Sequence, residues 1–158
     1  MKTMRWWFVA VLLGTAACGD ADAGMDGCSD PELEVCQVFA LVNEERAAAG
    51  LPAYTWNREL GISAQLHADD MVDQSYFSHT SLDGRTFDQR MRDAGYDGGP
   101  RGENIALGQR SAEQVMGDWM DSDGHRRNIL SSNSNEIGVG FLDNRWVQNF
   151  GFADRSGE

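Results

Sequence analysis

Three side chains of types that can perform chemistry stand at the edges of predicted elements. They are His79 in "YFSHTSLDGRT", Glu103 in "RGENIALG" and His125 in "SDGHRRNIL". Each lies beside glycine, serine or aromatic residues, a setting in which a scaffold exposes functional groups. Two neutral imidazoles and a carboxylate can hold a zinc ion with an open position, or the carboxylate can orient a bound water. Because no "HExxH" occurs, histidines hydrogen-bonded within turns remain the alternative.

Two helices are predicted ahead of His79. The first shows apolar residues at three- and four-residue steps and ends near Gly50 and Pro52, whereas Asn57 is a candidate N-cap for the second. Their apolar stripes are Val35, Phe39 and Val42, and then Leu60, Ala64, His67 and Met71. Because His67 falls on such a stripe, we interpret it as a core or boundary residue and not as a ligand.

Two capping boxes predict where a third and a fourth helix begin. Thr86 stands three residues before Gln89, and Ser111 stands three residues before Gln114. The stripes expected to be buried are Phe87, Met91 and Ala94, and then Ala112, Val115, Met116 and Trp119. The fourth helix is expected to end before His125, which we place on a turn that Gly124 makes sharp enough to direct the imidazole inward.

The end of the chain predicts strands. Apolar runs at 137–142 and 146–152 are separated by "DN", a turn pair typical of hairpins, and 103–108 is the candidate third strand. Four helices around a small antiparallel sheet would make an α+β domain in layers. The side chains expected to fill its core are Val115, Met116, Trp119, Ile137, Val139 and Trp146.

The order of these segments resembles the CAP superfamily, whose domain is also called the SCP domain, in its bacterial form. The resemblance covers about residues 36–152 and rests on "LVNEERAAAGLPAYTWNREL", "AQLHADDM", "YFSHTSLDGRTF", "RGENIALG", "VMGDWMDSDGHRRNIL", "IGVGF" and "WVQNFG". It implies an α-β-α sandwich with a central cleft, in which two histidines can bind a divalent metal, often zinc, beside two acids. By motif, the histidines are His79 and His125, and one acid is Glu103.

The second acid of that cleft is replaced by Ser122 in this chain. Asp121 and Asp123 are adjacent, but aspartates in such a loop are typically solvated or capping residues. Two functions are compatible with the set. One, which the resemblance to CAP proteins implies, is a module that binds a lipid, a small apolar ligand or a peptide in the cleft. The other is a metal-assisted hydrolase with two histidine ligands and Glu103 as general base. The incomplete acid pair favours binding.

Residues 1–17 have the features of a secretory signal peptide, with a basic start, a short apolar run and small residues before Cys18. "TAAC" resembles a lipobox, so Cys18 is a candidate for lipidation and for attachment to the membrane of the cell envelope. Cleavage after "ADA" at 21–23 is the alternative and would yield a secreted product. Residues 18–34 are rich in Gly, Asp and Ala and are predicted to tether a domain that covers 35–153.

The net charge, the single lysine and the cysteines limit the partners, nucleophiles and disulfides that the protein can have. The formal net charge of −12 argues against a nucleic-acid partner. The single lysine, Lys2, lies in the signal segment, which excludes a lysine nucleophile from the mature chain. Cys28 and Cys36 are predicted to form a disulfide because an exported chain meets an oxidising compartment, with two free thiols as the alternative.

Overall fold

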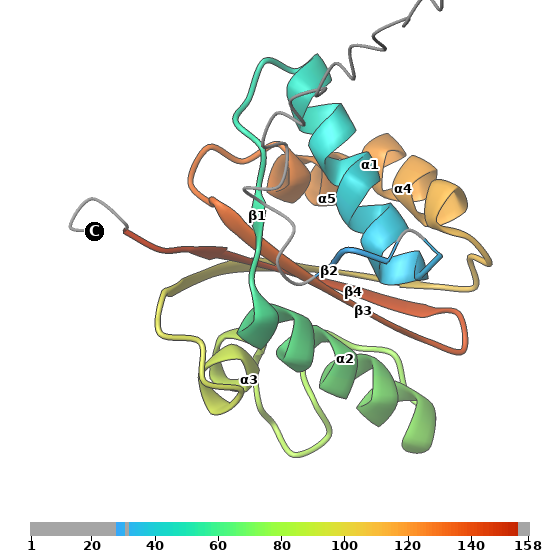
Figure 1. Ribbon diagram of the computed structural model, residues 1–158. Helices are drawn as coiled ribbons and strands as arrows, with labels where there is room; N and C mark the ends of the chain where they lie inside the picture. The colour runs from blue at the N-terminus through green and yellow to red at the C-terminus, as the bar shows by residue number, and fades with distance from the viewer. Residues whose placement is uncertain (1–27, 31, 155–158) are drawn as a thin grey trace, which may run out of the picture.

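The computed structural model describes residues 28–30 and 32–154, which form three layers (Figure 1). The elements are α1 (Glu34–Ala48), β1 (Thr55–Trp56), α2 (Arg58–Asp73), α3 (Phe87–Asp93), β2 (Gly99–Leu107), α4 (Ala112–Asp121), α5 (Asp123–Ile129), β3 (Glu136–Leu142) and β4 (Arg145–Phe152). Helices α1, α4 and α5 cover one face of the sheet, and α2 and α3 cover the other. The predicted α+β class and α-β-α architecture are confirmed.

The sheet has the strand order β1-β3-β4-β2. Strands β3, β4 and β2 are antiparallel as predicted, but the expectation of a purely antiparallel sheet is wrong at one edge, where β1 runs parallel to β3. This strand has only two residues, too few for an alternating pattern to reveal it. The "DN" turn between β3 and β4 is confirmed, since Asp143 and Asn144 both have positive φ, as a type I′ hairpin turn requires.

The predicted helix starts are confirmed by their capping bonds. Asn57 accepts a hydrogen bond from the Leu60 amide (2.9 Å), and Ser111 accepts one from the Gln114 amide (3.3 Å). Thr86 opens α3 with the expected capping box. The count of four helices is wrong, because the described residues include a fifth, α5. It has seven residues and begins directly after the Ser122 N-cap that ends α4, so it is too short to show a helical period of its own.

The core fills the space between the sheet and the helices on each face. All six side chains predicted to be buried are buried, with Trp119 and Trp146 essentially inaccessible to solvent. Both indole nitrogens donate to backbone carbonyls, which satisfies their polar atoms inside the core. The apolar patterns of α4 and of the β3–β4 hairpin therefore predicted these core positions.

Two glycines of β3 let α2 lie directly on the sheet. A Cβ at Gly138 would come within 2.0 Å of the Gly61 nitrogen, and one at Gly140 within 2.3 Å of the Gln65 nitrogen. These contacts are with helix backbone, which cannot swing aside as a side chain can. The close approach fixes α2 and, with it, the start of the loop that carries His79.

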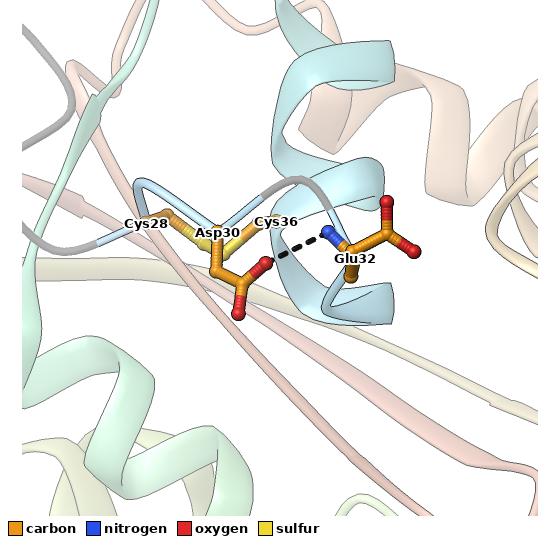
Figure 2. Close-up of a disulfide and its surroundings, with 4 residues drawn as sticks. All are labelled: Cys28, Asp30, Glu32 and Cys36. Atoms are coloured by element: carbon orange, nitrogen blue, oxygen red, sulfur yellow. Dashed lines mark hydrogen bonds between the residues drawn. A yellow bond between two sulfur atoms is a disulfide. The ribbon is translucent and has the colours of Figure 1, made fainter.

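A disulfide joins Cys28 to Cys36 at the start of α1, which confirms the predicted pairing (Figure 2). Both cysteines are buried in the core. The segment predicted to be a tether is therefore fixed to the domain from Cys28 onward. The signal peptide, Cys18 and the rest of the tether lie outside the described residues. Among the helices of the described part, none has the length and apolar character needed to cross a bilayer.

Candidate functional site

Glu103 occupies the middle of β2, the strand at one edge of the sheet, and its side chain is only 1% exposed. One carboxylate oxygen accepts a hydrogen bond from His79 Nδ1 (2.9 Å), and the other accepts one from Arg90 Nη2 (2.6 Å). The Asn149 amide, turned to suit its neighbours, adds a donor to the second oxygen at 3.3 Å. Both oxygens of this buried carboxylate are thus occupied by the protein.

Arg90 is the residue of this site that sequence reasoning missed. It lies on α3, is 5% exposed, and forms the buried ion pair with Glu103. Its other terminal nitrogen donates to the His79 carbonyl (3.0 Å), the Ser81 hydroxyl (3.2 Å) and the Arg85 carbonyl (3.0 Å). Arg90 therefore fixes both Glu103 and the loop that carries His79. A buried arginine in a short amphipathic helix has no distinctive sequence signal.

His79 itself is half exposed, with 54% of its side chain accessible. Because an ionised carboxylate only accepts hydrogen bonds, His79 Nδ1 must carry the proton that it shares with Glu103. When Nδ1 is the only protonated nitrogen, the lone pair is on Nε2, on the side of the ring away from Glu103. This arrangement suits a nitrogen that binds a metal or accepts a hydrogen bond from a ligand.

His67, on α2, also holds the loop that carries His79. It is fully buried on α2, as its place on the apolar stripe predicts, and its Nε2 donates to the Ser78 carbonyl (2.9 Å). Burial lowers the pKa of His67, so the ring is neutral at physiological pH. Its role in the structure is to anchor the backbone next to His79.

His125 lies in the first turns of α5 and is half-buried. The prediction that it stands on a turn sharpened by Gly124 is wrong, because Gly124 is helical and its φ is not positive. Partial burial, and to a smaller extent the nearby charge of His79, lower the pKa of His125.

Amide side chains fix α5 against β2 beside Glu103. The Asn104 amide donates to the His125 carbonyl (3.2 Å), and the Asn128 amide donates to Asn104 Oδ1 (2.8 Å). From the opposite side, Arg46 donates to the Ile129 carbonyl (2.8 Å). The backbone of α5 is held by contacts with distant segments, which explains why a short helix with an early glycine is stable here.

Ser122 and its acidic neighbours do not complete the site. Ser122 is half-buried as the N-cap between α4 and α5, whereas Asp121 and Asp123 are exposed. Asp123 forms an ion pair with Arg126. Within residues 28–30 and 32–154, no three His, Cys, Asp or Glu side chains are grouped so that they could hold a metal together. The arrangement offers two imidazoles, with Glu103 oriented toward one of them.

The fold and the order of the site residues can be compared with known proteins. Residues 39–150 match the model of the cysteine-rich secretory protein family, named CAP. The chain belongs to this family. The match covers all the elements that contribute His79, Glu103 and His125 to the site.

The relatives of this CAP chain include surface and extracellular proteins of bacteria. Bacillus subtilis YkwD is 41% identical over 117 residues, which cover 72% of this chain and 45% of YkwD. An extracellular SCP-domain protein of Bacillus anthracis is 32% identical with a TM-score of 0.74, over 76% of this chain and 40% of that protein. An outer surface protein of Borrelia burgdorferi, 23% identical, shares the fold with a TM-score of 0.69, over 79% of this chain and 96% of that chain. The chain spans less than half of the two Bacillus proteins.

Proposed function

We propose that this CAP domain is an exported binding module, in which His79 and His125 contact a lipid, a small apolar molecule or a peptide at the β2 edge of the sheet. The observation that carries the proposal is the burial of Glu103 and the bonding of both its carboxylate oxygens. Its carboxylate is buried, and its two oxygens are bonded to His79 and Arg90. This geometry suits a group that orients His79.

The same geometry argues against Glu103 as a general base. Such a base must take up a proton from a substrate or water within hydrogen-bond reach. A proton on this carboxylate would leave the buried Arg90 guanidinium without its counter-charge, at a cost of several kcal/mol. Glu103 therefore supports binding better than hydrolysis.

A divalent metal such as zinc would have two protein donors here among the described residues, His79 and His125, with water or the ligand completing its coordination. Imidazole nitrogens are suitable zinc ligands, and a histidine whose other nitrogen is hydrogen-bonded to a carboxylate is typical of metal centres. His79 and His125 would hold the ion, with Glu103 orienting the first. When bound, the metal would supply a Lewis acid for an oxygen atom of the ligand.

Apolar side chains on the His79 loop suggest which part of a ligand would bind beside the imidazole. Phe77 is 44% exposed and Leu82 is 62% exposed, on either side of His79 in sequence. Covering such surfaces with an alkyl chain is worth about 1 kcal/mol each, or roughly fivefold in affinity. The ligand that we propose therefore has an apolar portion.

Titration with a fluorescent fatty acid tests this function. Phe77→Ala and Leu82→Ala should each weaken binding about fivefold, because they remove apolar contact area. Leu142→Ala is the matched control, since Leu142 is an exposed leucine at the far end of β3, in the hairpin. Equal affinities for all four proteins would contradict an apolar site at the His79 loop.

One observation favours the alternative of a metal-assisted hydrolase. The bond from Nδ1 to Glu103 leaves the other ring nitrogen of the half-exposed His79 side chain available, as in a histidine that ligates a catalytic metal. Glu103→Gln distinguishes the two functions once circular dichroism shows that the variant is folded. A hydrolase acting on a peptide or ester substrate should lose about a hundredfold or more in rate. A binding module should keep most of its affinity for the fatty acid, because the glutamine oxygen can still accept the hydrogen bond from His79 Nδ1.

Attachment to the cell envelope through Cys18 is a further part of the proposal. A lipidated protein should enter the detergent phase and carry a diacylglyceryl mass on Cys18. An unmodified amino terminus at Gly24 would instead identify a freely secreted product.

A further inference from the structure

A pocket lies at the end of the sheet where β2 begins and β4 ends, beside the loop that follows α5 (Figure 1). Its volume is about 450 Å³, which is within the range of small-molecule sites. The described residues that line it are Arg101, Ser131, Ser132, Asn133 and Phe152. The residues of the candidate site around Glu103 are not among them, so this is a different pocket.

A bulge in β2 places Arg101 in this pocket. The register of β2 against β4 shifts between Pro100 and Gly102, so Arg101 is an extra residue that has no partner on β4. A bulge of this kind re-aims the side chain of the extra residue. Here the Arg101 guanidinium lies over the ring of Phe152, with 5.6 Å between Cζ and the ring centroid. The bulge and the aromatic ring together position the guanidinium at the wall of the pocket.

The positive charge of Arg101 is not matched by an acid of the described part of the chain. None of the ion pairs found among the described residues involves Arg101. The described residues that line the pocket include no aspartate and no glutamate. Because acidic residues outnumber basic ones by 25 to 13 in the sequence, a pocket with a guanidinium and no such acid is locally positive on a negative molecule.

The other polar groups of the pocket can donate hydrogen bonds to an oxygen atom. Ser131 and Ser132 contribute hydroxyls, and Asn133 contributes a side-chain amide. The Ser131 hydroxyl oxygen accepts a hydrogen bond from the Asn133 backbone amide (3.1 Å), and its own hydrogen can be donated to a ligand. Phe152 is 36% exposed and adds an apolar ring beside these donors.

We propose that this pocket binds a small organic oxyanion, either a carboxylate or a phosphate monoester. The oxygens of the ligand bind the Arg101 guanidinium and the serine hydroxyls, and its carbon skeleton packs against Phe152. The planar guanidinium matches two oxygens of a carboxylate or a phosphate with two parallel hydrogen bonds. The net charge of −12 repels anions at long range, but salt at physiological strength screens exposed charges beyond about 8 Å.

Nuclear magnetic resonance titration of the whole protein at physiological salt tests the proposal with three compounds that share an aromatic ring. The probes are benzoate, phenyl phosphate and the neutral benzyl alcohol. We expect both anions to cause saturable shifts of the amides of residues 99–102, 131–133 and 150–152, and we expect no saturable binding of the alcohol. The tighter of the two anions identifies which oxyanion the pocket selects.

A charge-neutral variant locates the site. Arg101→Gln should weaken the binding of both anions about fivefold, the loss expected for an exposed ion pair. Arg92→Gln is the matched control, since it removes the same charge from an exposed position of α3 that does not line the pocket. If Arg101→Gln fails to fold, Ser132→Ala on the exposed loop decides the question, with an expected loss of about threefold.

Three results would overturn the oxyanion site. They are equal affinities of the Arg101→Gln and Arg92→Gln proteins for benzoate and phenyl phosphate, saturable binding of benzyl alcohol as tight as that of benzoate, and anion-dependent shifts confined to other segments. The probes carry no alkyl chain, and Phe77 and Leu82 do not line this pocket. Failure of this proposal is therefore distinguishable from failure of the ligand site proposed at His79.

Discussion

The substitution Glu103→Gln is predicted to destabilise the domain strongly, because it removes the charge that faces the buried Arg90 guanidinium. The side chains are 1% and 5% exposed, so solvent cannot replace the lost carboxylate. Removing one partner of a buried ion pair costs about 3–5 kcal/mol. Glutamine keeps one oxygen that can accept a hydrogen bond, so we expect the lower end, about 3 kcal/mol. This is a large part of the roughly 5–15 kcal/mol that stabilises a domain of this size.

Urea unfolding followed by tryptophan fluorescence and circular dichroism measures this change. A loss of about 3 kcal/mol should lower the melting temperature by about 12 °C. Glu44→Gln, at an exposed position of α1, is the control and should change little. Arg90→Met should cost at least as much as Glu103→Gln, because it also removes the donor to three acceptors of the His79 loop. A loss below about 1 kcal/mol for Glu103→Gln would refute the reasoning about the buried pair.

Three further predictions concern the packing, the disulfide and the response to pH. Gly138→Ala should unfold the domain or destabilise it by several kcal/mol in urea, since its Cβ would overlap the backbone of α2, whereas Gly117→Ala in an open part of α4 should be neutral or slightly stabilising. Reduction of the Cys28–Cys36 disulfide should lower the free energy of unfolding by about 2.5 kcal/mol, and no change in the melting curve would count against a stabilising role. Burial lowers the pKa of His67, so this imidazole binds a proton more readily in the unfolded chain than in the folded domain. The free energy of unfolding should therefore fall as the pH drops below about 6.5. The variant His67→Gln should show a shallower fall between about pH 7 and 5.

The elements that local signals determine were predictable from the sequence. The N-caps at Asn57 and Ser111 and the capping box at Thr86 depend on residues three positions apart, and each starts a helix where expected. The core positions of α4 followed from its helical stripe, and those of β3 followed from an apolar run. The family resemblance placed His79 and Glu103 in one cleft, and in the structure a direct hydrogen bond joins them.

The features that distant contacts determine were not predictable in this way. Helix α5 is held by Arg46 and Asn104, which lie far from it in sequence, and nothing near Gly124 indicates a helix. The ion pair of Arg90 with Glu103 joins α3 to β2 and depends on how these elements pack. The interpretation of Glu103 as a general base overlooked this pair, because only the packed structure shows both carboxylate oxygens occupied.

The central claim is that Glu103 orients His79 so that Nε2 faces the ligand. A long-range proton–nitrogen correlation spectrum of the histidine rings at about pH 8, where imidazoles are neutral, tests it most directly when recorded with and without zinc. We expect the His79 ring to be protonated on Nδ1, with zinc-dependent shifts of His79 Nε2 and of one His125 nitrogen, and the His67 ring to be unchanged. A His79 ring protonated on Nε2, or zinc titration without a shift of either His79 or His125, would contradict it.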